Sequence, residues 1–119
     1  MRVRAARGAI VVARDDAVTV LDATGRLLLT MLERNAVQTE DLVSILFTAT
    51  EDLHSAFPAE AARRMGLGMV PLMCAREISV DGSMPRVIRI LLHFHSELGL
   101  SEVAHAYLEG AEGLRDDLD

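Results

Sequence analysis

The amino-acid sequence predicts an α+β fold in which a mixed β-sheet carries two helices on one face. Four segments rich in apolar and β-branched residues are typical of strands, and two segments have apolar residues at helical spacing. The chain has 119 residues, of which 50% are hydrophobic, so we expect residues 1–119 to form a single domain. Because two helices in a small domain cover little more than one sheet face, the second face is expected to stay open.

The first third of the chain predicts a strand followed by a long helix. The strand is expected over residues 2–14, where Gly8 marks a bulge or a close approach of another segment. Asp15-Asp16 then offers an N-cap, and apolar residues recur at helical spacing between positions 18 and 32. Asn35 is expected to end this helix as a left-handed cap.

The middle of the chain predicts two further strands around a short helix. Leu42–Thr48 is apolar at nearly every position, which favours a central strand with both faces covered. Pro58 suits the start of a helix over residues 59–65. Residues 69–78 are expected to form a third strand, which ends at the turn Asp81-Gly82-Ser83.

Residues 86–96 predict a strand with two different faces. The face expected in the core consists of Ile88, Ile90, Leu92 and Phe94. The opposite face carries Val87, Arg89, Leu91, His93 and His95. The second face is too apolar for open solvent yet bears charge, as in a subunit interface or a pocket wall. An uncovered face of this kind predicts a homo-oligomer.

The tail after residue 100 supports two interpretations. Propensity favours a helix over residues 101–109, because Ala, Leu and Glu are frequent there. Alternation of His105, Tyr107 and Glu109 favours a strand instead.

Composition excludes several partners. The formal net charge is −6, all twelve basic residues are arginines, and only four residues are aromatic, which argues against a nucleic-acid binder. No apolar run is long enough to cross a membrane. A single cysteine fits a reducing compartment. We therefore expect a soluble, cytoplasmic protein that binds neither nucleic acid nor membrane.

Motifs for common cofactors are missing from the sequence. There is no GxGxxG, GxSxG, HExxH or CxxC motif, so we expect no cofactor and no metal. His93 and His95 share a strand face but lack an evident third ligand, which favours ordinary interfacial histidines. Arg7 and Arg89 interrupt predicted strands, where a charge must face water, a ligand or an interface.

Short motifs along almost the whole chain resemble the monofunctional, AroH-class chorismate mutases of Bacillus type. They are RAARGA at 4–9, FTATEDL at 47–53, AFPA at 56–59, VPL at 70–72, ARE at 75–77, RVIR at 86–89, YL at 107–108 and LR at 114–115. The motifs occur in the order and at the spacing of the family. The resemblance implies a homotrimeric pseudo α/β-barrel, an active site at each subunit interface, and a strand after about residue 104.

The resemblance also implies roles for individual residues. Arg7 matches an arginine that grips a substrate carboxylate, and Arg89 one that contacts the breaking ether oxygen of chorismate. Cys74 and Glu77 match residues near the ring hydroxyl. The remaining lining corresponds to Phe57, Arg63, Tyr107, Leu114 and Arg115, the last on a mobile tail over about residues 112–119. The sequence departs from the family at Glu60, where some members carry lysine, and it lacks the proline often found after the last arginine.

The implied reaction suits these residues. Rearrangement of chorismate to prephenate is a one-step pericyclic reaction, which needs positioning and charge stabilisation rather than a cofactor. Two other classes share parts of the pattern. A non-catalytic trimer that binds small carboxylates would not need Arg89, Glu77 and Cys74 together, whereas an imine-processing, deaminase-like trimer would need an activated water.

Overall fold

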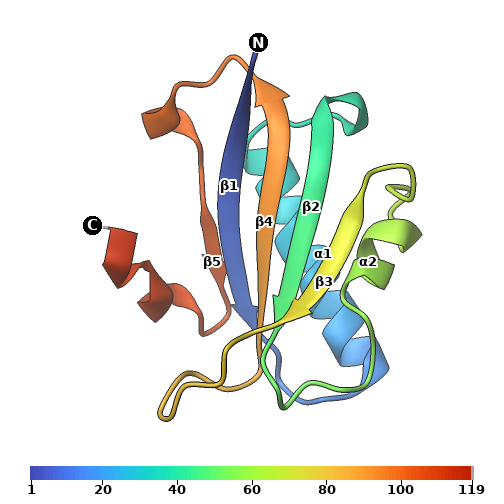
Figure 1. Cartoon of the computed structure of the whole chain (residues 1–119), viewed down its shortest axis with the longest axis vertical. Helices are drawn as coiled ribbons and strands as arrows, with labels where there is room; N and C mark the ends of the chain where they lie inside the picture. Colours follow the sequence, from blue (N-terminus) through green and yellow to red (C-terminus); the bar gives the residue numbers. More distant parts are fainter. Residues whose placement is uncertain (119) are drawn as a thin grey trace.

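A mixed five-stranded sheet forms the centre of the computed structural model, which describes residues 1–118 (Figure 1). The strands lie in the order β3-β2-β4-β1-β5. They are β1 (Arg2–Val11), β2 (Leu42–Ala49), β3 (Leu72–Arg76), β4 (Val87–Ser96) and β5 (Ala106–Leu108). The long strand β4 pairs antiparallel with both β1 and β2, whereas the edge strands β3 and β5 pair parallel with β2 and β1. The predicted α+β class is confirmed.

Both α-helices lie on the same side of the sheet (Figure 1). They are α1 (Ala17–Arg34) and α2 (Ala59–Arg64), and short 3-10 turns occupy Thr39–Asp41, Leu100–Glu102 and Glu112–Leu118. The predicted N-cap is confirmed, because the Asp16 side chain accepts a hydrogen bond of 2.8 Å from the backbone N–H of Thr19. Within residues 1–118 no helix is both long and apolar enough to cross a membrane.

The core fills the space between α1 and the sheet. On β4, the predicted core face is confirmed, since Ile88, Ile90, Leu92 and Phe94 are at most 2% exposed. On the other face, Arg89, Leu91 and His95 are exposed. Val87 differs from them because Ala111 and its neighbours in the tail bury it. The sheet therefore has a helix-covered face and an open face.

Three predictions about strands need correction. β2 is not covered on both faces in this chain, because only Ile45 and Phe47 are buried. β1 ends at Val11 rather than residue 14, since the chain then bends towards the cap of α1. β3 spans residues 72–76 rather than 69–78, because Arg76 is opposite Ala49, the last residue of β2.

The tail forms a short strand, not a helix. β5 pairs with β1, so the alternating pattern was the better guide and the propensity for helix was wrong. Asn35 is not left-handed as predicted, with φ of −104°; its neighbour Ala36 takes that conformation. The buried Asn35 side chain instead donates to the carbonyl of Ala104 at 2.9 Å and accepts from its N–H at 2.8 Å. These two bonds tie the end of α1 to the start of β5.

Gly8 is the point where α1 and β5 approach β1 most closely. A Cβ atom added there would overlap Met31 Sδ and come within 3.2 Å of the carbonyl oxygen of Ala106. The close approach predicted for this glycine is confirmed. Its lack of a side chain lets β5 and α1 pack on the same residue of β1.

We expect Gly8→Ala to destabilise the protein by about 1–3 kcal/mol, since the added methyl group has no free space. Gly25→Ala is the matched control, because it lies in α1 and an added methyl group would have no neighbouring atom within 4 Å. That substitution should stabilise by about 0.5–1 kcal/mol through helix propensity. Urea unfolding of the three proteins measures both values. Equal stability of the two variants would contradict the packing argument.

Candidate active site

A hollow of about 290 Å³ opens on the uncovered sheet face. It is lined by Arg7, Gly8, Leu46, Thr48, Arg89, Ile90, Leu91 and Tyr107. The strand register explains the grouping, because Leu91 is opposite both Arg7 and Leu46, and Arg89 is opposite Thr48. Residues opposite one another point to the same side of a sheet. Two arginines from different strands thus reach one partly apolar hollow.

Arg89 is held by a carboxylate. Its Nε donates to Oε2 of Glu77 at 3.0 Å, and the side chains are 44% and 17% exposed. The hydroxyl of Thr48 donates to the same oxygen at 2.9 Å. The backbone N–H of Glu77 in turn donates to the carbonyl of Ala49. These contacts fix the direction of the Arg89 guanidinium, while most of its charge stays available to an anion.

The last turn of the chain comes to the same face. Leu114 packs with Tyr107 against buried Ala9 and Val87. Burial and the nearby positive charges of Arg7 and Arg115 lower the pKa of His105. Arg7 and Arg115 thus both act on the same imidazole. Six of the expected site residues form this sheet-face set: Arg7, Glu77, Arg89, Tyr107, Leu114 and Arg115.

The other three expected residues lie elsewhere. Cys74 is opposite Phe47, which faces the helices, so its side chain points to the helix-covered side of edge strand β3. Phe57 and Cys74 line a separate hollow of about 400 Å³. Arg63 lies on α2, where its Nε is 3.0 Å from Oε1 of Glu60. We call Phe57, Arg63 and Cys74 the edge set; a single chain does not bring them to Arg7 and Arg89.

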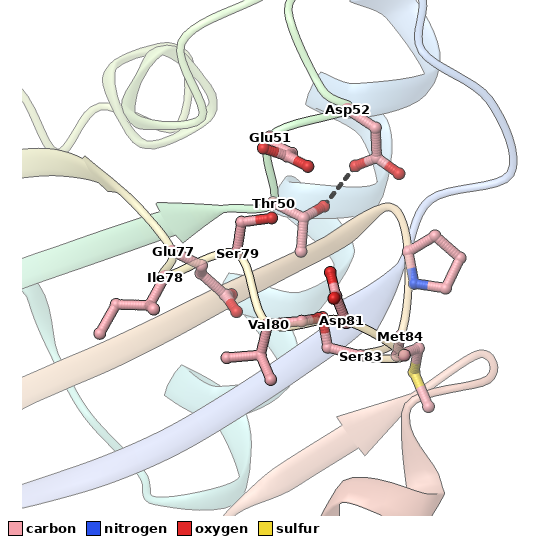
Figure 2. A pocket seen from close by; sticks show the side chains of 12 residues that line it. Thr50, Glu51, Asp52, Glu77, Ile78, Ser79, Val80, Asp81, Ser83 and Met84 are labelled. Atoms are coloured by element: carbon pink, nitrogen blue, oxygen red, sulfur yellow. Dashed lines mark hydrogen bonds between the residues drawn. The ribbon is translucent and has the colours of Figure 1, made fainter.

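A third hollow of about 250 Å³ lies beneath the loop that follows β3 (Figure 2). Its charged lining residues are all acidic, namely Glu51, Asp52, Glu77 and Asp81. Asp52 has a structural role there, because it accepts bonds from the Thr50 hydroxyl and from the backbone N–H of Arg86. The Thr50 bond is the main cause that lowers the pKa of Asp52. An anionic ligand would be repelled from this hollow.

No metal site is evident in the described part of the chain. Residues 1–118 contain no group of three or more His, Cys, Asp or Glu side chains placed to hold a metal ion. Nδ1 of His93 is 3.2 Å from the hydroxyl of Ser44, and His95 is exposed. Both positions suit the simpler interpretation of these histidines as surface or interfacial residues.

Sequence reasoning missed Thr48 and His105. Thr48 is one of only two polar residues in a mostly apolar strand, which was a usable signal, but its bond to Glu77 spans 29 positions. His105 accepts a hydrogen bond from Arg7 across 98 positions. No local pattern marks either contact.

Fold and site together define a small α+β protein with two arginines at a partly apolar hollow on its open sheet face. The family model for chorismate mutase type I matches residues 3–118. A chorismate mutase AroH from Thermus thermophilus is 51% identical over 98% of this chain and 97% of its own, and one from Bacillus subtilis (strain 168) is 38% identical over 99% and 94%. The structure of a chorismate mutase from Clostridium thermocellum superposes with a TM-score of 0.91 at 41% identity, covering 92% of this chain and 98% of that one. The chain belongs to the chorismate mutase type I family.

We expect Thr48→Val to lower kcat/KM for chorismate by about 3- to 10-fold, because it removes one hydrogen bond to the carboxylate that directs Arg89. Thr30→Val is the control, since the Thr30 hydroxyl donates only to a carbonyl of its own helix. Steady-state kinetics on both variants measure the effect. If Thr48→Val matches the parent protein, the Glu77 carboxylate does not depend on this bond.

Proposed function

We propose that this protein converts chorismate to prephenate in a site assembled between two copies of the chain within a homotrimer. The observation that carries this proposal is the ion pair between Glu77 and an exposed Arg89 on the open sheet face, where Arg89 shares a hollow with Arg7. The family supplies the reaction, and the arrangement of the two residue sets supports an interface. A cytoplasmic location is part of the proposal, and the free, exposed thiol of Cys74 fits a reducing compartment.

Positioning is the first task of such a site. Chorismate is a small dianion that must be held in a compact conformer before its ends can react. A guanidinium group binds a carboxylate through two parallel hydrogen bonds, which restricts both distance and orientation. Arg7 is exposed at the hollow and is suited to this role, and Arg115 on the last turn adds a second positive charge that also acts on His105. The acidic protein thus concentrates positive charge where its ligand binds.

Stabilisation of the transition state is the second task. Cleavage of the ether bond runs ahead of carbon–carbon bond formation, so negative charge develops on the ether oxygen. An arginine already oriented towards that oxygen binds the transition state more tightly than the substrate, which is what raises the rate. Arg89 has the required preorganisation through Glu77. Glu77 also offers an acceptor for the ring hydroxyl of the substrate.

The two residue sets explain why a second copy is proposed. Phe57 is 74% exposed and Cys74 lies on an edge strand, so neither is enclosed by its own chain. The open face also leaves large apolar side chains in water, including Met73 and Ile78 near the same edge. Burial of that surface against a neighbouring chain would bring one chain's edge set towards the other's sheet-face set. The site would then be complete only in the oligomer.

Replacing Arg89 by citrulline should lower kcat by about 10²- to 10³-fold while changing KM little, because it removes charge but keeps size and most hydrogen bonds. Arg89→Lys keeps the charge and loses the forked geometry, so it should retain only part of the activity. Arg7→Ala is the comparison, with an effect mainly on KM. Chorismate absorbance gives the rates. A citrulline variant with parental kcat would make Arg89 a positioning group only.

A mixture of two inactive variants tests the shared site. Arg63→Ala removes part of the edge set, and Arg89→Ala part of the sheet-face set. If each site in a cyclic trimer uses both sets from different chains, random mixing of equal amounts should restore about a quarter of the sites. Mass spectrometry confirms that mixed oligomers form. Mixed oligomers without activity would show that both sets act within one chain, and a stable 13.0 kDa monomer would contradict the assembly itself.

A further inference from the structure

His105 extends the pairing between β1 and β5 with its side chain. The backbone pairing of these strands begins with Gly8 opposite Ala106. One residue earlier, the backbone N–H of Arg7 donates to Nδ1 of His105 at 2.9 Å. The imidazole therefore occupies the place where a strand carbonyl would otherwise accept. Asn35 holds the backbone of the adjacent Ala104 by two hydrogen bonds, which fixes the chain next to His105.

Positive charges surround His105. Arg7 faces it from β1, and Arg115 acts on it from the last turn. Arg34 reaches over from α1, with Nη1 3.3 Å from the backbone carbonyl of His105. On the tail itself, the two nearest acids along the chain both have partners of their own. Glu102 accepts from the backbone N–H of Gly99 at 2.7 Å, and Glu109 is engaged by Arg26 through two bonds of 2.8 Å. A proton added to this imidazole would thus bring a further positive charge among guanidinium groups.

We propose that neutral His105 is a positioning residue for Arg7, and that protonation of its imidazole disables the carboxylate-binding part of the site. This inference rests on the proposed function for the role of Arg7. A protonated Nδ1 carries a hydrogen and cannot accept from the Arg7 N–H, so two donors would face each other. β5 has only three residues, so losing this contact loosens both Arg7 and the tail that carries Arg115.

The contact also sets the tautomer and the direction of the pH effect. Nδ1 is the acceptor, so the single proton of the neutral ring must be on Nε2. Burial and the charges of Arg7 and Arg115 lower the pKa of His105 from its ordinary value of 6.5. The unfolded chain therefore binds this proton more readily. The stability that neutral His105 contributes is complete above pH 6.5 and is lost as the pH falls from there through the lower pKa of the folded state.

Kinetics of two variants separate positioning from bulk structure. His105→Asn keeps an acceptor oxygen near the place of Nδ1 but does not titrate, whereas His105→Ala removes the acceptor. At neutral pH we expect His105→Asn to stay within about threefold of the parent and His105→Ala to raise KM about tenfold with kcat nearly unchanged. His95→Asn, at an exposed position on β4, is the control and should behave as the parent.

The pH profile gives the decisive comparison. The ratio of kcat/KM between parent and His105→Asn should be constant above about pH 7 and fall as the pH is lowered towards about 5. Titrations that the two proteins have in common cancel in this ratio. A flat ratio would overturn the proposal, as would a His105→Ala variant with parental KM.

Nitrogen-15 NMR of the imidazoles in the unliganded parent protein gives a readout that needs no activity. The proposal expects Nδ1 of His105 to be unprotonated at neutral pH with the proton on Nε2, and a midpoint below 6.5. A protonated Nδ1 at neutral pH would overturn it. If the parent protein folds and shows this signature but does not convert chorismate, the proposed function fails while the structural role of His105 stands.

Discussion

Two hydrogen bonds between the side chain of Asn35 and the backbone of Ala104 fix the segment that leads into β5, next to the sheet face that carries Arg7 and Arg89. They act like a strand pairing between the end of α1 and the start of β5, because the amide side chain both donates and accepts as a peptide group does. A third hydrogen bond, from the Asn35 side-chain amide to the carbonyl of Met31, satisfies the second N–H of that amide. With Ala104 fixed, the three residues of β5 lie in register with β1, and His105 meets the backbone of Arg7.

Because helices cover only one face of the sheet, the candidate site residues fall into two groups. Helices bury one face, so the charged groups from β1 and β4 gather on the other, where Arg7 and Arg89 share a hollow. The same restriction leaves Phe57 and Cys74 around the edge of β3, away from those arginines. Glu77 sits between the regions, directly after β3, and offsets part of the positive charge of Arg89. In the proposed oligomer, shared surfaces would bring these two groups of residues together.

The sequence predicted the features that depend on residues close together along the chain. The N-cap at Asp16 and the apolar face of α1 depend on neighbours within a few residues, so both could be read from the sequence. For residues 106–108, helix propensity was misleading while residue alternation and the family motifs predicted a strand, because the stability of this strand comes from Asn35 and β1 rather than from its own propensity. Hydrophobicity alone also failed to predict that only one face of β2 is buried. For the site, family motifs named Arg89 and Glu77, but Thr48 and His105 act through contacts 29 and 98 positions apart.

The strand order has a consequence for folding while the chain is being synthesised. β1 precedes the other strands along the chain, yet its partners are β4 and β5, with Arg2 opposite Ser96 and Ile10 opposite Leu108. Until the C-terminal third has emerged, β1 and the apolar face of α1 have no complete sheet to join. Such distant pairings are closed late because of their loop entropy. Ile10, Leu27 and Leu28, which the folded chain buries completely, therefore lack part of their packing partners until β4 and β5 are available.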